Sequence, residues 1–201
     1  VKKRAEIVDE MLRKVGLFEV RDRWANRLSG GMKRRLGIAQ AIIGNPRVII
    51  VDEPTTGLDP EERIRFRNLL VELSRNRIVI FSTHIIEDIA SSCNQVGVIN
   101  KGSLKYHGTP SEMVGIAKDV TWVFEVSLEE FAQLPPELLI VHHIRMGESI
   151  RVRCLSETQP VPNAVRTNPV LEDSYLWLLR GVKLANNEQI ITCLLYTSDA
   201  A

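Results

Sequence analysis

Two acidic residues and a histidine follow two apolar runs of the sequence. Asp52 and Glu53 come directly after the β-branched run Val48–Val51, and His84 comes shortly after the run Ile78–Phe81. Runs of this kind are typical of strands buried on both faces of a parallel sheet. Ligands usually bind at the carboxyl edge of such a sheet. We therefore expect the three side chains to face a common crevice.

These side chains suit magnesium-dependent phosphoryl transfer. Asp52 is suited to hold the metal ion, directly or through water. Glu53 is placed to orient or deprotonate an attacking water, and His84 to contact a terminal phosphate or that water. The alternatives are that the carboxylates only cap the next turn and that His84 packs in the core.

A glycine pair at a predicted helix start forms a second candidate site. Ser29 is a good N-cap, and free backbone N–H groups at Gly30 and Gly31 suit a phosphate because no side chain blocks its approach. The alternative is an ordinary glycine-rich helix entrance. We expect the following basic residues, Lys33, Arg34 and Arg35, to form a solvated face without a role in the site.

Helix and strand signals alternate from Ser29 onward. The first helix is predicted to end near Gly44 and to turn one apolar stripe toward the core: Met32, Leu36, Ala39 and Ile43. A second helix is predicted with Asp59 as N-cap and Pro60 at its first position. Its core-facing residues are Phe66, Leu69, Leu70 and Leu73.

The pattern of predicted helices and strands changes after about residue 117. Residues 1–117 read as an α/β domain that begins with a helix, and residues 118–182 as a small α+β accessory domain. Its expected elements are strands at 121–126, 138–145 and 149–154 and a helix from Leu171 that Gly181 ends. Residues 183–201 form a tail. Its last part, 193–201, belongs to no expected element and resembles translated sequencing-adaptor sequence; the alternative is a frayed natural terminus.

Charge and hydropathy exclude several classes of function. The 201 residues include 26 basic and 25 acidic side chains, a net charge of +1, which argues against a broad nucleic-acid-binding face. No run of 18 or more apolar residues occurs. We expect no nucleic-acid partner, and a peripheral position if the protein serves a membrane.

The order and spacing of these motifs resemble those of the ATP-binding cassette (ABC) ATPases, over residues 1 to about 115. Leu28-Ser29-Gly30-Gly31-Met32 resembles the signature loop, although Met32 stands where glutamine is more frequent, as in export-type members. Val48–Asp52 resembles the Walker B strand, and Glu53 the catalytic glutamate. Gly57-Leu58-Asp59 resembles the D-loop, and His84 the switch histidine. The accessory domain is similar to the C-terminal extension of bacterial multidrug and antibiotic exporter ATPases.

The resemblance implies an ATPase subunit with the parallel sheet of the P-loop NTPases. In the family, two such domains sandwich ATP and Mg²⁺ and drive membrane-spanning subunits from the cytoplasmic face of the cell membrane. Ser29, Gly30 and Gly31 would act on nucleotide held by the partner domain, and Asp59 would bridge the two sites. Asp52, as metal ligand, and the catalytic pair Glu53 and His84 would serve nucleotide on their own subunit.

A phosphate-binding loop of the form G-x-x-x-x-G-K-S/T does not occur in these 201 residues. The chain opens with Val1 in mid-helix pattern, so we expect a truncated beginning and little activity alone. Two other interpretations stay open: a soluble ABC ATPase acting on ribosomes or DNA, and a non-catalytic interaction module. The transported substrate cannot be read from this domain.

Overall fold

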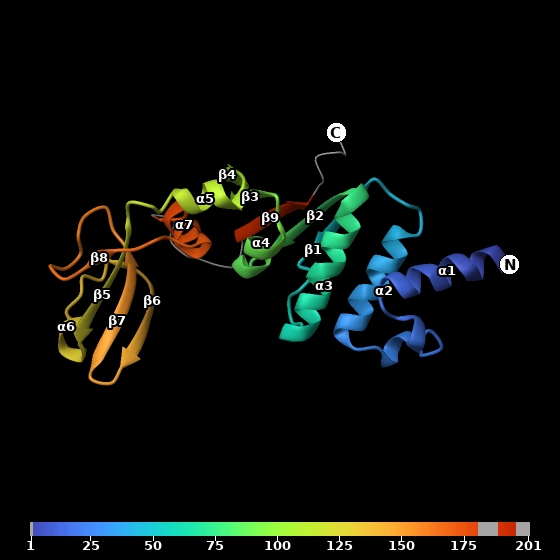
Figure 1. Cartoon of the computed structure of the whole chain (residues 1–201), viewed down its shortest axis with the longest axis horizontal. Helices are drawn as coiled ribbons and strands as arrows, with labels where there is room; N and C mark the ends of the chain where they lie inside the picture. The colour runs from blue at the N-terminus through green and yellow to red at the C-terminus, as the bar shows by residue number, and fades with distance from the viewer. Residues whose placement is uncertain (1, 181–188, 196–201) are drawn as a thin grey trace. The chain divides into compact units, whose positions relative to one another are not determined.

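The computed structural model describes residues 2–180 and 189–195 (Figure 1). The chain divides into two compact units. The first holds residues 2–99 and 189–195, and the second holds residues 100–180 of the described range. Each unit has a hydrophobic core of its own.

The first unit alternates helices and strands, as predicted. Its elements are α1 (Lys2–Lys14), α2 (Gly30–Ile42), β1 (Val48–Asp52), α3 (Pro60–Leu73), β2 (Ile78–Thr83), α4 (Ile86–Ser92), β3 (Gln95–Asn100) and β9 (Gln189–Leu195). Short 3-10 turns occur at Phe18–Val20, Ala25–Arg27 and Ser74–Asn76. Helix α1 ends where Gly16 adopts a left-handed conformation, with φ +67°, which is favourable for glycine.

The sheet of the first unit is mixed. β1 and β2 run parallel, from Val48 opposite Ile78 to Asp52 opposite Ser82. β9 lies on the other side of β2 and runs antiparallel to it, which gives the strand order β1-β2-β9-β3. The α/β class and the parallel pairing are thus confirmed, and β9 is an addition that the sequence did not predict.

Strand β9 also corrects the prediction for the tail. Residues 193–195 were expected to lie outside any element, but they pair with β2. Residues 183–188 and 196–201 of the predicted tail lie outside the described residues, as does Gly181.

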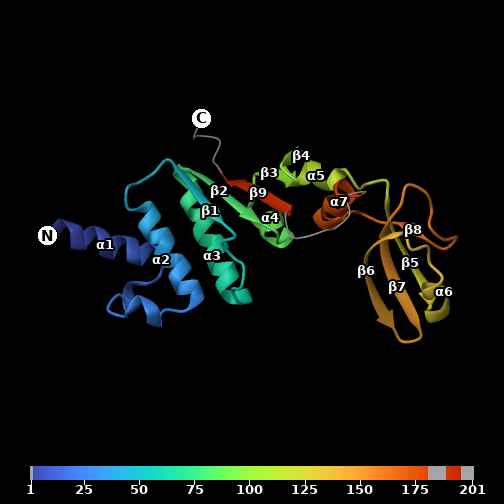
Figure 2. The same ribbon diagram turned by 180° about the vertical axis from the view of Figure 1, so that it is seen from behind.

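Helix α3 covers one face of the parallel pair. It runs beside β1 and β2 in opposite views (Figures 1 and 2). Its four predicted core residues are all buried, and they share one core with Ile49, Val79 and Phe81. This confirms the assignment of α3 and its apolar face.

Strand β1 is buried on one face only. Ile49 is buried, whereas Ile50 on the opposite face is 76% exposed. The prediction of a strand buried on both faces is therefore wrong, because among the described residues the core covers only the Ile49 face. In β2, Val79 and Phe81 are buried and Ile80 between them is half-buried.

The apolar stripe of α2 also differs slightly from the prediction. Ile38, Ala39 and Ile42 are buried, whereas Ile43 is exposed. Ile43 is the C-cap, where the chain leaves the helix, so its side chain no longer continues the buried stripe.

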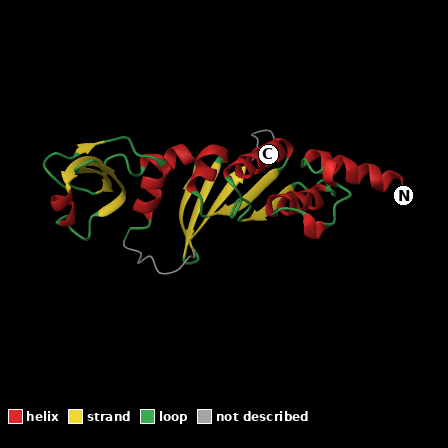
Figure 3. Cartoon of the chain, turned by 90° about the horizontal axis from the view of Figure 1, so that it is seen from below, coloured by secondary structure: helices red, strands yellow, loops and turns green. Residues whose placement is uncertain are grey.

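The second unit is an antiparallel sheet with short helices. Its elements are β4 (Ser103–Gly108), α5 (Pro110–Gly115), β5 (Thr121–Ser127), α6 (Leu128–Ala132), β6 (Leu139–Met146), β7 (Ser149–Leu155), β8 (Val165–Arg166) and α7 (Leu171–Leu178). Four of the strands follow the order β6-β7-β5-β8, and Figure 3 shows the strands in yellow. The three predicted strands and the helix from Leu171 are confirmed, and the predicted boundary at 117/118 stays a prediction.

A buried ion pair ties α7 to the sheet of the second unit. Nε and Nη2 of Arg153 donate to the carboxylate of Asp173 at 2.9 and 2.6 Å. The side chain of Asp173 is fully buried, and that of Arg153 is 13% exposed. Asp173 also accepts from the backbone N–H of Val170 at 2.7 Å, and so caps the start of α7. Hydrogen bonding to Asp173 raises the pKa of Arg153.

Candidate functional site

The ends of β1 and β2 bring Glu53 and His84 into contact. Nδ1 of His84 lies 3.0 and 2.9 Å from the two carboxylate oxygens of Glu53. Parallel pairing explains the contact, because it places the residues that follow both strands at the same edge of the sheet. Both side chains remain open to solvent, at 33% exposure for Glu53 and 57% for His84.

Glu53 is held in an uncommon backbone conformation. Its φ is +45°, in the left-handed region that few residues other than glycine adopt. Its N–H donates to the backbone carbonyl and to the hydroxyl of Ser82, both at 3.1 Å. Thr56 Oγ1 donates to its Oε2 at 2.6 Å. These bonds turn the carboxylate toward His84.

Asp52 ends β1 as an exposed carboxylate. The hydroxyl of Ser82 donates to its Oδ1, so Ser82 bridges Asp52 and the N–H of Glu53. Mg²⁺ in phosphoryl-transfer sites is usually held by one or two carboxylates together with substrate phosphates and waters. An exposed aspartate beside a second carboxylate fits that donor set.

The described residues contain no protein-only metal cluster. No group of three or more His, Cys, Asp or Glu side chains lies close enough together there to hold an ion. Any metal at Asp52 would therefore need other ligands as well, in line with the usual behaviour of Mg²⁺.

The start of α2 has the geometry expected of an anion-binding turn. Ser29 is the N-cap, and its Oγ accepts from the N–H of Met32 at 3.1 Å. A side chain added at Gly30 would meet no atom within 4 Å, whereas one added at Gly31 would meet Glu62 Oε2 at 2.7 Å. The approach to Gly30 is thus open, and Gly31 packs against α3.

The start of α3 is capped by Asp59, as predicted. Its Oδ1 accepts from the N–H of Glu62 at 2.8 Å, and Pro60 occupies the first turn. Gly57, with φ +71°, makes the turn that leads into this cap. Asp59 is exposed and close in sequence to Glu53, but its side-chain bond stays within its own helix start.

The structure therefore joins some of the predicted residues and leaves others apart. Glu53 contacts His84 directly and is linked to Asp52 through Ser82. Among the described residues, the hydrogen bonds of Ser29 and Asp59 do not reach this set. Their roles in a shared site stay predictions.

Several contributing residues were not predicted. Thr56 and Ser82 position Glu53, and no charge or periodicity marked either of them. Thr55 donates to the fully buried carboxylate of Asp88, to which Arg67 Nη1 also donates at 3.4 Å. This network ties the turn after β1 to α4 and α3, and burial reveals it where the sequence pattern does not.

Arg35 corrects another expectation. Its side chain is only 11% exposed and pairs with Glu62, so it does not belong to a solvated face. Lys33, by contrast, is exposed as predicted.

Comparison with known proteins shows similarity to ABC transporter ATP-binding domains. Residues 2–56, which include the Ser29–Gly31 turn and Asp52 to Glu53, match the family model described as "ABC transporter". The chain is 32% identical over 187 residues to the ABC transporter ATP-binding protein YxlF of Bacillus subtilis, a match that covers 85% of this chain and 63% of YxlF. The chain carries an ABC transporter ATP-binding domain sequence.

A second relative and a solved structure agree with the ABC assignment. The chain is 41% identical over 112 residues to ABC transporter A family member 3 of Arabidopsis thaliana. This match covers 55% of this chain and 12% of that protein. The fold is similar to that of cbiO1 from Clostridium perfringens, part of the ABC transporter complex cbiONQ, with a TM-score of 0.53 and 32% identity. That match covers 57% of this chain and 46% of cbiO1.

The chain spans less than two thirds of the length of these curated ABC relatives. No helix among residues 2–180 and 189–195 has the length and apolar character needed to cross a bilayer.

Proposed function

We propose that this ABC domain hydrolyses ATP, with Mg²⁺, and thereby drives export of a substrate through partner membrane subunits. The observation that carries the proposal is the contact of Glu53 with His84 at the shared edge of β1 and β2. A solvent-open carboxylate held against an imidazole is a suitable base for a water that attacks a phosphate.

In this proposal Glu53 and His84 have different roles. The Glu53 carboxylate accepts the proton of the attacking water. Nδ1 of His84 contacts the Glu53 carboxylate. The other ring nitrogen would contact the attacking water or the terminal phosphate.

Asp52 would hold Mg²⁺, with Ser82 fixing the orientation of its carboxylate. A bound Mg²⁺ would neutralise the charge that develops on the phosphate oxygens. The Ser29–Gly31 turn would bind the terminal phosphate of nucleotide on a second ATP-binding domain, and Asp59 would bridge the two sites.

The proposal also needs a phosphate-binding loop that is not among the 201 residues. We propose that the complete protein supplies it and that the present chain alone is inactive. The domain would then work as a dimer at the cytoplasmic face of the cell membrane, joined to membrane-spanning subunits. Tight, magnesium-dependent ATP binding by this chain alone would contradict the proposal of an inactive chain.

The test of hydrolysis uses the complete reading frame that encodes this chain. Removal of a general base typically lowers a rate by on the order of a hundredfold to ten-thousandfold, so Glu53→Gln should lower kcat for ATP hydrolysis by that factor. Glu61→Gln, an exposed carboxylate on α3, is the matched control and should leave kcat unchanged. Equal activity of the two variants would overturn the role of Glu53.

The export role rests on the resemblance of Met32 and of the second unit to export-type members. Coexpression with membrane-spanning proteins from neighbouring reading frames should yield a complex. In inside-out vesicles that contain this complex, ATP should drive uptake of the transported compound. ATP-dependent release from the vesicles would instead indicate import.

A further inference from the structure

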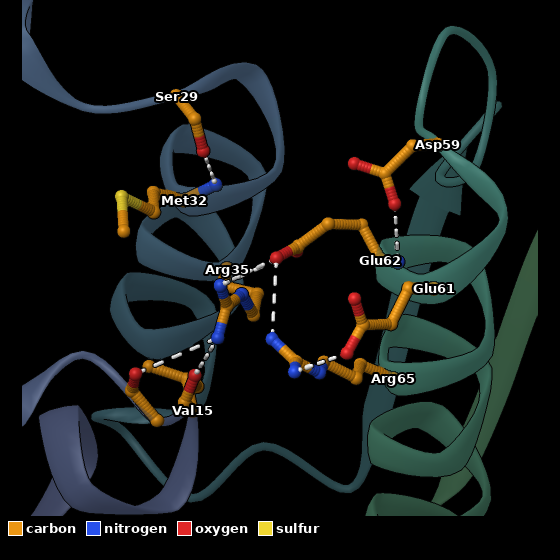
Figure 4. Close-up of polar contacts among 9 residues, drawn as sticks. Val15, Ser29, Met32, Arg35, Asp59, Glu61, Glu62 and Arg65 are labelled. Carbon is orange, nitrogen blue, oxygen red and sulfur yellow. Dashed lines mark hydrogen bonds and ion pairs between the residues drawn. The ribbon is translucent and has the colours of Figure 1, made fainter.

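An ion pair joins helix α2 to the start of α3. Nη2 of Arg35 lies 3.3 Å from each carboxylate oxygen of Glu62. The two side chains are 11% and 20% exposed. Figure 4 shows Arg35 reaching from the helix that Ser29 begins to the helix that Asp59 caps. The pair therefore lies between the two helix starts that the proposed function places between two ATP-binding domains.

Glu62 does not make the hydrogen bond that a glutamate at its position in a helix commonly makes. It is the third residue of α3, where glutamate commonly bonds back to the N–H of the N-cap residue. Glu112 and Glu130 do so in the second unit, at Thr109 and Ser127, each at 2.8 Å. Glu62 instead directs its carboxylate toward α2, although Asp59 still caps its N–H.

Two glycines pack against the pair. A side chain added at Gly31, in the Ser29–Gly31 turn, would approach Glu62 Oε2 to 2.7 Å. One added at Gly16, just after α1, would approach Arg35 Nη1 to 3.2 Å. Backbone thus lies close to the pair at both ends, and no other residue type would allow the same approach at Gly31 without displacing the carboxylate.

Arg35 also holds the end of α1. Its Nη1 lies 3.3 Å from the carbonyl oxygen of Val15 and 3.5 Å from that of Gly16, as Figure 4 shows for Val15. Its Nε is buried without a hydrogen-bond partner. Among the described residues, Glu62 is the carboxylate that this guanidinium contacts. Arg65, one turn along α3, lies 3.6 Å from Glu62 and does not link the helices.

We propose that Arg35 and Glu62 are positioning residues, which fix the Ser29–Gly31 turn relative to Asp59. The inference rests on the proposed function, in which the turn and Asp59 act together between two ATP-binding domains. Neither residue needs to touch nucleotide. The pair sets the orientation of one helix start against the other, through Gly31 on one side and the Asp59 cap on the other.

The test measures ATP hydrolysis and local amide exchange in the complete protein. Because a small misplacement of a catalytic group can cost up to roughly a hundredfold in rate, Glu62→Gln and Arg35→Met should each lower kcat at least roughly tenfold. KM for ATP should change by less than about twofold, since lost positioning affects the transition state more than binding. The double variant should be no slower than the slower single variant, because the two residues act as one unit.

Glu61→Gln and Lys33→Gln are the matched controls and should keep the wild-type kcat. Amide exchange at Met32, whose N–H donates to Ser29, should become faster in Glu62→Gln than in Glu61→Gln. If Glu62→Gln does not fold, Glu62→Asp is used in its place. It keeps the charge but shortens the reach, and should give a kcat between those expected of wild type and Glu62→Gln.

The outcomes separate the two proposals. A folded wild-type protein without ATP hydrolysis overturns the proposed function, and the positioning role with it. An active wild type with unchanged kcat and Met32 exchange in Glu62→Gln, or in Glu62→Asp where that variant is used, overturns the positioning role alone. A wild-type rate in Arg35→Met has the same meaning.

Discussion

Two side-chain pairs of the chain, one in each unit, differ in their exposure to solvent. In the first unit, Glu53 and His84 meet at a sheet edge and both stay open to solvent. In the second unit, Arg153 and Asp173 meet in the interior, and every contact of the pair that we describe serves the start of α7 or its link to the sheet. A pair that is largely enclosed is costly to break, whereas a pair left at an edge is available to a ligand.

The largest expected effect comes from breaking the enclosed pair. Asp173→Asn would leave Arg153 as a buried charge without its carboxylate, and should lower the free energy of unfolding of the second unit by about 3–5 kcal/mol. Amide exchange in β5 and β7 measures it. Glu53→Gln is the comparison and should change stability by less than about 1 kcal/mol, because its pair is exposed. Similar losses in both variants would remove the distinction between the units.

A thiol in the second unit tests whether its interior is sealed. Cys154 is fully buried, and burial raises its pKa from 9.0 to about 11. At pH 8 the fraction of thiolate, which is the reactive form, should therefore be roughly a hundredfold lower than for an ordinary thiol. The Cys154 peptide should label rapidly with a maleimide only after unfolding, as mass spectrometry can show. Rapid labelling of the native protein would indicate an open interior.

The glycine pair offers a smaller test in the first unit. Alanine favours helices over glycine by about 1 kcal/mol, and a side chain at Gly30 meets nothing, so Gly30→Ala should be neutral or stabilising. Gly31→Ala should instead lower stability by about 1–2 kcal/mol, because it displaces Glu62 from a largely buried pair. Thermal unfolding of the two variants compares them directly. A loss of stability in Gly30→Ala alone would contradict the packing described for Gly31.

The smallest effect concerns the glutamates that cap helices locally. Hydrogen bonds from Thr109 lower the pKa of Glu112, and those from Ser127 lower that of Glu130. A lowered pKa in the folded state means that the caps stabilise above the unfolded pKa, about 4.3, and are lost as pH falls through the folded value. NMR titration of the Thr109 amide should show this change, and Glu112→Gln should abolish it. A Thr109 amide that titrates unchanged in Glu112→Gln would exclude this cap as the cause.

Much of the fold follows from local pattern. The caps at Ser29 and Asp59 and the core face of α3 are local features, so sequence alone predicts them. The meeting of Glu53 with His84 follows from one further step, since parallel strands bring their carboxyl ends to one edge. The burial of β1 is overestimated, because packing of other elements decides how many faces of a strand are covered, and the residues of the strand do not show that packing.

What the sequence did not predict depends on long-range packing. Arg35 stands in a run of three basic residues, a pattern that is usually solvated, and only the approach of α3 shows that it is enclosed. Asp88 and Thr55 are similar, as each looks like an ordinary polar residue until the other is placed beside it. The antiparallel pairing of β9 with β2 is also a long-range contact. The residues of β9 alone do not show which strand it pairs with.

The left-handed backbone of Glu53 has a consequence for how this protein can vary. Holding a glutamate in that conformation costs about 1 kcal/mol more than holding a glycine, so backbone strain alone favours glycine at position 53. Glu53→Gly would relieve that strain, but it would remove the bond from Thr56 and the proton acceptor at the sheet edge. Backbone strain and chemistry thus favour different residues at this one position, and a search for thermostable variants should leave it out.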